Sequence, residues 1–500
     1  MRYYDTIVVG SGFGGSVLAA RLAQAGEQVL VLERGPWWGQ GDGDGERQPF
    51  PRGVRLGRFV RNVRMNKGRR SREIVFNRRG LFEVHGFDHL WALGASGVGG
   101  GSLVYANGQG VPSPDYWDAF PPELTAEEMA PYYKLADEVL EPHVLPGWQA
   151  RQEDLNRALR HSGLGETGAV ELAVTFGPDP STPETVHNAA GIRQQTCRMC
   201  GDCVLGCPHR SKNTLDLSYL AMAQRSGAVI HPMSEVVSVS SEPNGYWVHW
   251  MDHRSRHVAS ATSRRLVLAA GTLNTLRLLF AARSAGRLRP LPDALGRHLS
   301  PNGDYASLFW RVRSGSAGPG VVFNAIRRSE DHARDGLFLG EASAPVDSLP
   351  MPGVLRNWLR QSRFIFALGR DSATATATFD GHAVRCDAGR ASDARYFARV
   401  EAVTRQLAVH YEPRSVVTNI PFGAGSPTIA TTHTVGGAAM ARRLEDAVVD
   451  HTGEVRGQPG LYVVDSSILA APPGVPPSKT ILAMAERIAS IATATGAPRA

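Results

Sequence analysis

Short runs of consecutive apolar residues divide the chain and predict buried β-strands. The first run, 5–10, is followed by the helix-compatible segment 16–25 and by a second run, 28–33, that closes on an acidic residue. Similar runs occupy 266–271 and 460–465, each ending at a glycine or an acidic residue. Strands that are apolar at nearly every position are typical of parallel sheets covered on both faces. The pattern therefore predicts an α/β fold.

The pattern changes in the stretch 305–429, within which the segment 341–357 carries prolines and glycine. We expect strands over 305–313, 321–327, 364–370 and 372–379, a helix over 391–410, and a lid loop over 341–357. Within this stretch, aromatic residues are candidates for lining an apolar pocket, although core packing also explains them. They are Phe309, Trp310, Phe338, Trp358 and Phe366.

Composition adds that this is an ordinary globular protein. Of the 500 residues, 42% are hydrophobic and 20% are charged, and no apolar run is long enough to span a membrane. No charged-then-apolar leader or twin-arginine signal precedes the first strand, so we expect a cytoplasmic protein without an integral membrane segment. Zinc-finger, helix-turn-helix and aromatic RNA-binding signatures are also absent, which excludes nucleic acid as an expected partner.

The net charge of +7 is unevenly distributed, because arginines crowd the stretch 52–79. Arg55, Arg58, Arg61 and Arg64 recur at every third position there. Two interpretations remain open: a patch that binds an acidic partner, or a solvated face of an ordinary connection.

The first strand ends in the motif Gly10-x-Gly12-x-x-Gly15, which predicts a dinucleotide-binding site. In this strand–turn–helix context the first glycine permits the turn, the second lets backbone approach a pyrophosphate, and the third allows close helix packing. The start of the helix offers free N–H groups to phosphates. Glu33, at the end of the next strand, can accept a hydrogen bond from a ribose hydroxyl. The motif by itself does not distinguish NAD(P) from FAD.

Three further segments have the same character. The glycine run 99–101 lies within GASGVGGGSLVYAN and lets backbone approach a second part of a cofactor. The segment 266–275 is a buried strand ending in a glycine turn, and GLYVVDSSIL ends its strand at Asp465. A proline-rich turn over 472–477 then precedes a helix expected over 479–493.

Together these segments resemble the glucose–methanol–choline (GMC) oxidoreductases, most clearly the bacterial cholesterol-oxidase-like branch. The matching motifs are GVGGGSLVYAN, LVLAAGT, THTVGG and GLYVVDSS, besides the amino-terminal fingerprint. The resemblance implies an α/β fold in which a Rossmann-like FAD-binding domain is interleaved with a substrate domain. That second domain would have a mainly antiparallel sheet with helices, as in p-hydroxybenzoate hydroxylase. The implied ranges are 1–110, 190–304 and 430–500 for FAD and 111–189 and 305–429 for substrate.

The resemblance also implies which residues bind FAD. Val237 would meet the adenine through its backbone, Asp465 would hold the ribityl side, and the dipole of the final helix would point at the flavin. The expected FAD-binding residues are Gly10, Gly12, Gly14, Gly15, Glu33, Arg34, Gly100, Gly101, Ser102, Asn107, Val237, Gly271, Asp465, Pro477 and Ser478.

The motif Thr-His-Thr-Val-Gly-Gly places His433 where alcohol-oxidising relatives have their catalytic base. Histidine suits this role because its pKa lies near working pH. Those relatives carry a second histidine or an asparagine just before the proline that precedes the last helix, whereas this chain has Pro476 there. Proline has no side-chain donor. Ser478 and Lys479 are the nearest polar candidates to compensate.

Four cysteines, Cys197, Cys200, Cys203 and Cys207, form a Cys-rich loop over 197–208 with the spacing of bacterial ferredoxins. We expect a [4Fe–4S] cluster, while zinc and a metal-free loop remain alternatives. Cys207 is the favoured fourth ligand, with Cys386 as the alternative.

These observations give three hypotheses. The first is an FAD-dependent dehydrogenase or oxidase that takes hydride from an alcohol on a bulky, fairly apolar substrate such as a sterol or secondary metabolite. Its electrons would pass through the cluster to a protein or quinone-like acceptor. The second is a lyase or isomerase on the same fold with a structural flavin, suggested by Pro476. The third is an electron-transfer component that binds an acidic partner through the arginine-rich stretch.

Overall fold

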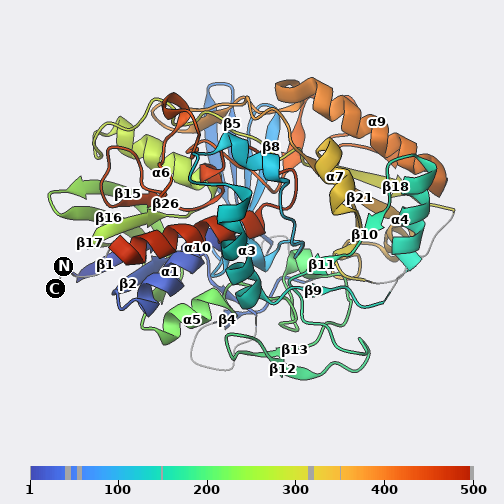
Figure 1. Ribbon diagram of the computed structural model, residues 1–500, viewed down its shortest axis with the longest axis horizontal. Coiled ribbons are helices and arrows are strands. Elements are labelled where there is room, and N and C mark those ends of the chain that lie inside the picture. The colour runs from blue at the N-terminus through green and yellow to red at the C-terminus, as the bar shows by residue number, and fades with distance from the viewer. Residues whose placement is uncertain are drawn as a thin grey trace.

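The computed structural model describes residues 2–39, 47–52, 59–147, 150–313, 320–349 and 351–495. Its first layer is a seven-stranded sheet with strand order β14-β2-β1-β17-β16-β15, to which β26 adds beside β17 (Figure 1). Strands β1, β2, β14, β17 and β26 are parallel, whereas β15 and β16 form an antiparallel extension. The bounds are β1 Arg2–Val9, β2 Val29–Leu32, β14 Val229–His231, β15 Ser234–Glu242, β16 Gly245–Asp252, β17 His257–Leu268 and β26 Leu461–Val463.

The apolar runs of the sequence form the middle of this sheet. Every residue of β2 is buried, and so is the last half of β1, as expected for central parallel strands covered on both faces. Helix α1 (Phe13–Gln24) packs against α10 (Ser478–Thr495), and α10 packs against α3 (Ala126–Leu140). Figure 1 shows α1 and α10 side by side, with α3 crossing one end of α10.

Small residues allow α1 to lie unusually close to the strand ends. A Cβ on Gly14 would come within 1.5 Å of the Val464 carbonyl oxygen, and one on Gly15 within 2.2 Å of the Gly10 carbonyl oxygen. Any larger side chain would push the helix away from the sheet. The expected packing role of Gly15 therefore has a direct structural basis.

The second layer is a six-stranded antiparallel sheet with strand order β10-β19-β20-β21-β18-β24. Helices α4, α7 and α9 lie beside it on the right of Figure 1. The bounds are β10 Thr167–Gly168, β18 Tyr305–Trp310, β19 Phe323–Arg327, β20 Leu337–Ala342, β21 Arg363–Gly369 and β24 Ser415–Val417 for the strands, and α4 Ala150–His161, α7 Ser329–Asp335 and α9 Ala394–Tyr411 for the helices.

A five-stranded sheet, with order β25-β8-β7-β5-β6, packs between these layers. Two more helices flank the first sheet, and α8 leads into β21. The bounds are β5 Val60–Lys67, β6 Arg70–Val75, β7 Phe82–Gly86, β8 Leu90–Ala95, β25 Ile429–Thr431, α5 Tyr219–Arg225, α6 Thr272–Ser284 and α8 Gly353–Arg360. Four short two-stranded pairs complete the described part: β3 Trp37–Trp38 with β4 Arg47–Gln48, β9 His143–Val144 with β11 Glu171–Leu172, β12 Thr185–His187 with β13 Arg193–Gln195, and β22 Ala377–Phe379 with β23 Val384–Cys386.

Two local expectations for the stretch 305–429 were wrong. The strand expected over 372–379 is reduced to β22, because the Asp371 carboxylate accepts the N–H of Ala373 at 2.9 Å and Ala373 has a left-handed φ of 47°. Such side-chain bonds replace a sheet ladder. The loop expected over 341–357 instead contains the end of β20 and the start of α8.

Among the described residues, no helix is long and apolar enough to cross a membrane. The cytoplasmic location stays a prediction.

Candidate active site

A cavity of about 550 Å³ runs from the turn between β1 and α1 to the six-stranded sheet. Its wall combines the glycine turn, the second glycine segment, the start of α6 and the start of α10. Most of the expected site residues line it: Gly10, Gly12, Gly14, Glu33, Arg34, Gly100, Gly101, Asn107, Gly271, His433, Asp465, Pro477 and Ser478.

The glycine turn leaves room for a ligand at one position. A Cβ on Gly10 would lie 2.3 Å from the Ala269 carbonyl oxygen, so Gly10 permits the close approach of β1 and β17. A Cβ on Gly12, in contrast, would meet no protein atom within 4 Å. Gly12 precedes the first residue of α1 and faces the cavity, where N–H groups at a helix start favour an anion. This geometry fits the pyrophosphate of a dinucleotide.

Glu33 lies at the end of β2 and is fixed by short hydrogen bonds. Its carboxylate accepts the Ser11 hydroxyl at 2.7 Å, the Ser11 N–H at 3.2 Å and the Gly35 N–H at 2.9 Å. The carboxylate therefore holds the turn and presents its remaining acceptor capacity to the cavity wall. Sequence reasoning had not identified Ser11 as a partner.

The wall beside Glu33 is completed by the first residues of β15. Ser234, Glu235 and Val236 line the cavity, whereas Val237 is 45% exposed and lies outside the lining. The register of β15 shifts between Val236 and Ser238. Val236, and not Val237, therefore belongs to the lining of this end of the cavity beside Glu33, and a backbone contact of Val237 with adenine stays a prediction.

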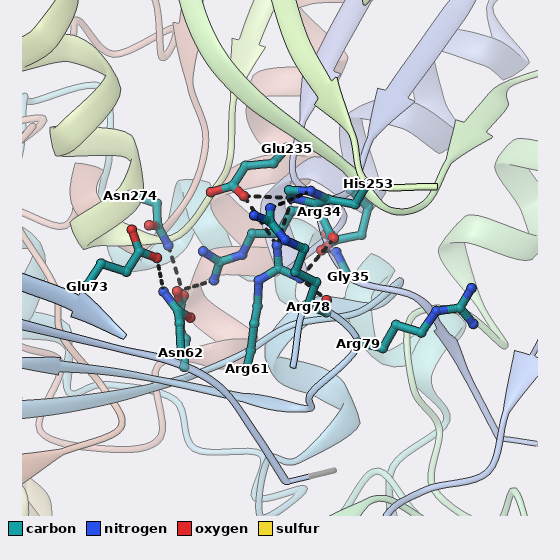
Figure 2. A network of polar contacts seen from close by, with 12 residues as sticks. Arg34, Gly35, Arg61, Asn62, Glu73, Arg78, Arg79, Glu235, His253 and Asn274 are labelled. Atoms are coloured by element: carbon teal, nitrogen blue, oxygen red, sulfur yellow. Dashed lines mark hydrogen bonds and ion pairs between the residues drawn. The ribbon is translucent and has the colours of Figure 1, made fainter. Parts of the chain in front are cut away.

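A buried ionic network lies at this end, and Figure 2 shows the part of it around Arg34, Arg61 and Glu235. Arg34 pairs with Glu83, and Glu83 also lies 3.3 Å from His85. Burial by itself would lower the pKa of Arg34, but the Glu83 carboxylate raises it above its ordinary value. The pKa of Glu83 is held well below its usual range against burial, chiefly by Arg34 and then by His85. All three side chains line the cavity.

The arginine-rich stretch contributes to the same network rather than forming one solvated face. Arg61 is 3% exposed and donates to Glu235 at 3.2 Å, and Arg64 donates to Glu235 at 3.3 Å. Figure 2 shows Arg61 and Glu235 in the middle of this network, with His253 on one side of them and Asn274 on the other. Arg55 and Arg58 lie outside the described residues.

Besides its glycines, the second glycine segment contributes Ser102, which braces the protein internally, and Asn107, which lines the cavity. Ser102 donates to the Gly99 carbonyl at 2.7 Å and accepts the Leu215 N–H at 3.0 Å, so its hydroxyl stays within the protein. Asn107 is fully buried and lines the cavity, yet neither its amide nitrogen nor its amide oxygen has a hydrogen-bond partner in the described structure. Buried polar atoms are normally paired. This orphaned amide fits a ligand, such as a flavin, that supplies both partners.

Asp465, at the end of β26, ties that strand to the β17–α6 turn. Its carboxylate accepts the Gly271 N–H at 2.9 Å, the Thr275 hydroxyl at 2.6 Å and the Ser467 hydroxyl at 2.6 Å. Burial raises the pKa of Asp465. It reaches the cavity wall with most of its acceptor capacity already used, so a contact with a ribityl chain stays a prediction.

His433 lines the cavity and is held by a residue that sequence reasoning missed. Its Nδ1 lies 2.8 Å from Oδ1 and 3.1 Å from Oδ2 of Asp304, whose side chain is 2% exposed. Asp304 immediately precedes β18 and comes from a part of the chain far from the THTVGG motif. No local pattern pointed to it, because its only signal is tertiary proximity.

Of the candidates at the start of α10, Pro477 and Ser478 lie at the cavity and Lys479 does not. Pro476 lines the cavity wall as well. Lys479 is buried, but its ammonium pairs with Asp137 of α3 at 2.8 Å, outside the cavity lining. Lys479 therefore holds α10 against α3 in this structure.

The wall opposite the glycine turn is apolar. Val322 and Phe323 of the β19 region, Ala342 of β20 and Phe366 of β21 face the cavity with His433. Of the five aromatic candidates, only Phe366 is part of this lining, while Phe309 and Phe338 are packed in the core.

The four cysteines of the Cys-rich loop surround one small pocket of about 10 Å³. Backbone N–H groups of Met199 and Ser211 donate to the sulfurs of Cys197 and Cys207, each at 3.3 Å. Cys386 lies on β23 and is not part of this pocket. The structure therefore brings together the four favoured ligands and leaves the alternative apart.

Burial raises the pKa of the Cys197 thiol to about 12 and that of the Cys203 thiol to about 11, and it also raises the pKa of Cys200. These three thiols are therefore protonated in the absence of a metal. Within the described ranges, no three His, Cys, Asp or Glu side chains are placed to hold one metal ion, and zinc stays an alternative for this loop. A [4Fe–4S] cluster makes a different demand, because each cysteine binds a separate iron and the sulfurs surround the cluster. The donor set fits such a cluster, although the pocket as it stands is small.

The loop also borders the main cavity. Val204 and Leu205, between Cys203 and Cys207, are part of the cavity lining. Buried Lys212 donates to the carbonyls of Cys203 and Tyr105, both at 2.9 Å, and thereby joins the loop to the second glycine segment.

Two family models match the chain. Residues 389–485 match the GMC oxidoreductase model, and residues 8–57 match an NAD(P)-binding Rossmann-like domain. The first match contains His433 and the start of α10, and the second contains the glycine turn and Glu33.

Curated relatives match over nearly the whole chain. A cholesterol oxidase of Mycobacterium tuberculosis is 28% identical, covering 98% of this chain and 91% of its own length. A cholesterol oxidase of Acinetobacter baumannii is 27% identical, with coverage of 97% and 94%. A long-chain-alcohol oxidase of Arabidopsis thaliana is 24% identical, with coverage of 97% and 67%.

Solved structures share the fold at low sequence identity. A fungal aryl-alcohol oxidase superposes with a TM-score of 0.64 at 15% identity, covering 98% of this chain and 99% of the other. Pyridoxine 4-oxidase of "Mesorbium loti" gives a TM-score of 0.61 at 19% identity, with coverage of 97% and 98%.

Proposed function

Because the chain is a GMC oxidoreductase of the cholesterol-oxidase-like branch, we propose that it oxidises an alcohol group on a bulky, largely apolar substrate with FAD as its cofactor. The observation that carries this proposal is the position of His433. It faces a cavity whose other end is a dinucleotide turn and whose near wall is built from Phe323, Phe366 and Ala342. Sterols and long-chain alcohols are the substrate chemistry that the names of the relatives favour.

In this mechanism His433 accepts the proton of the substrate hydroxyl at Nε2. The carbinol carbon gives up its hydrogen with the bonding electron pair, and a C=O bond forms. FAD, when bound, supplies the acceptor for that hydride. The start of α10 directs its positive end toward the same region through Ser478 and favours negative charge there.

Pro476 favours one alternative. Its position leaves the substrate oxygen without the second side-chain donor that alcohol-oxidising relatives carry, and losing one such donor commonly costs about 3 kcal/mol of transition-state stabilisation. A lyase or isomerase that keeps its flavin oxidised is therefore the second candidate. The two differ in one observation, since only the oxidoreductase bleaches its flavin when substrate is added without oxygen.

We further propose that Cys197, Cys200, Cys203 and Cys207 hold a [4Fe–4S] cluster and that electrons leave to a protein or quinone-like acceptor. Such a cluster supplies one-electron transfer. The proposal is supported by the common pocket of the four thiols and by the contact of the loop with the main cavity. Docking of an acidic partner on the arginine-rich stretch has less support, because Arg61 and Arg64 are committed to Glu235.

The test is anaerobic reduction of the flavin by a sterol or a long-chain alcohol, followed at the flavin absorption band. Replacement His433→Asn is expected to slow reduction roughly 10²–10⁴-fold, the usual contribution of a general base, while FAD remains bound. His382→Ala, at an exposed histidine on the β22–β23 turn, is the matched control. Reduction of the His433→Asn flavin at the wild-type rate would overturn the mechanism.

A further inference from the structure

The contact between Asp304 and His433 joins two distant parts of the chain at the cavity wall. We propose that Asp304 is a positioning residue that fixes the tautomer of His433 and preorganises it as a base. This inference rests on the proposed function of His433. Its first support is geometric, because both carboxylate oxygens of Asp304 lie within 3.1 Å of Nδ1 and the carboxylate is shielded from solvent.

The surroundings of the carboxylate determine the direction of the hydrogen bond. Oδ2 of Asp304 also accepts the N–H of Thr432 at 2.8 Å and the hydroxyl of Thr431 at 2.9 Å. A carboxylate that already faces two donors acts as an acceptor toward the ring as well. Nδ1 of His433 therefore donates, and the lone pair of the neutral imidazole is placed on Nε2, the nitrogen that a cavity ligand can reach.

Further contacts restrain the histidine in this orientation. Its N–H donates to the Thr431 hydroxyl at 2.9 Å, and that hydroxyl also contacts the Pro301 carbonyl at 3.0 Å. The ring packs edge-on against Phe366 with centroids 6.2 Å apart. The imidazole is thus held between a carboxylate and an aromatic wall, as a preorganised base requires.

The other titratable groups near Asp304 and His433 either bind the neighbouring turn or stay neutral. Tyr396 of α9 donates to the Gly303 carbonyl at 2.8 Å, and Asp371, which follows β21, accepts the Gly303 N–H at 2.8 Å. Both brace the turn that carries Asp304. Across the cavity, burial raises the pKa of Tyr105, so that phenol stays neutral. In the described part of the chain, Asp304 is the one carboxylate that contacts the His433 ring.

The consequence is a preorganised base where the second donor is missing. A carboxylate beside a histidine stabilises the imidazolium that forms when Nε2 takes the substrate proton. Asp304 lies on the Nδ1 side of the His433 ring and therefore cannot replace the side-chain donor that is missing at Pro476. It supports His433, which is the one member of the catalytic pair that this chain retains.

The first test is Asp304→Asn in the FAD-loaded protein. An amide can donate to Nδ1 and thereby favour a proton on Nε2, the unproductive tautomer. We expect flavin reduction to fall at least about 10²-fold. The protonated ring nitrogen of His433, followed by NMR of ¹⁵N-labelled histidine and assigned with His433→Asn, is expected to change from Nδ1 to Nε2. Asp304→Glu, which keeps the carboxylate, is expected to restore the proton on Nδ1.

Asp371→Asn is the matched control, because it makes the same chemical change in a carboxylate that braces the same turn without touching His433. We expect it to leave the proton of His433 on Nδ1. An unchanged tautomer in Asp304→Asn, or the same change of tautomer in Asp371→Asn, would overturn the role of Asp304. If His433→Asn itself reduces flavin normally, the proposed function fails. If His433→Asn is inactive while Asp304→Asn matches wild type in tautomer and rate, only the present inference fails.

Discussion

Single residues of the glycine turn have different physical tasks, although the motif presents them as equivalents. Gly10 and Gly14 lie against backbone carbonyls at the ends of neighbouring strands, whereas a Cβ on Gly12 would meet no protein atom within 4 Å. The fold itself therefore requires Gly10 and Gly14, while a role of Gly12 in binding a cofactor stays a prediction. Asn107 belongs with Gly12, because its buried amide has partners only if a ligand provides them.

This difference gives a prediction for the pair Gly12→Ala and Gly14→Ala. Gly12 has a φ of −74°, which alanine adopts freely, so Gly12→Ala is expected to fold normally and to lose FAD affinity at least about 10-fold. In Gly14→Ala, a Cβ would lie 1.5 Å from the Val464 oxygen, so the helix must move and stability must fall. FAD retention and the thermal midpoint distinguish the variants. Equal loss of stability in both would contradict this assignment.

At the end of the cavity beside Glu33, charged side chains connect elements that are far apart in the sequence. Strand β5 contributes Arg61, β15 contributes Glu235, and His253 lies in the turn that follows β16 (Figure 2). Burial alone would raise the pKa of Glu235, but the His253 hydrogen bond and the nearby guanidinium groups hold it well below its usual range. The ionised carboxylate is therefore part of what joins the five-stranded and seven-stranded sheets.

Arg61→Met tests this junction. Removing one partner of a buried ion pair leaves its carboxylate less compensated, so we expect a loss on the order of 3 kcal/mol at pH 7. A depressed carboxylate pKa stabilises the fold above the unfolded value, near 4.5, and that contribution disappears as pH falls toward the folded value. The difference between wild type and variant in urea unfolding should therefore be constant near neutrality and shrink below about pH 4.5. Arg72→Met, at an exposed arginine of β6, is the control. A loss independent of pH would exclude the ion pair as the cause.

At the scale of the whole molecule, the main cavity and the Cys-rich loop share a wall. The cavity lies between the dinucleotide sheet and the antiparallel sheet, and Val204 and Leu205 of the loop close one side of it. Lys212, with its pKa lowered by burial to about 8, bridges the loop and the glycine segment through three backbone carbonyls. A redox centre in the loop would therefore be separated from the cofactor cavity by little more than these side chains.

Metal analysis of the anaerobically purified protein decides this point. We expect about four irons and equivalent sulfide per chain, with a broad absorption that bleaches on reduction. Cys200→Ser should lower the iron content and leave the flavin in place, whereas Cys386→Ser should retain iron because that thiol lies outside the pocket. A wild-type protein that contains flavin but no iron would overturn the relay. Peroxide release would then separate an oxidase from a non-oxidative enzyme.

The sequence by itself determined the features that depend on neighbouring residues. The apolar runs of β1, β2, β17 and β26, the glycine turn and the final helix all follow from local burial and backbone geometry, and the expected helix over 479–493 became α10 with little change. The motifs also indicated residues that share a cavity. His433 and Asp465 line the main cavity, and the four cysteines surround the small pocket, because each motif includes its own strand or turn.

Only the tertiary structure decided contacts between side chains that no local pattern relates. Asp304 reaches His433 because β18 and the THTVGG segment meet at one corner of the cavity, and Lys479 turns toward Asp137 because α3 packs on α10. In the same way, Arg61 and Arg64 of the arginine-rich stretch became part of a buried network because they reach Glu235 of β15, whereas β6 in the same stretch is exposed. Charges in such places are fixed by burial and by partners from distant segments, which a linear pattern does not contain.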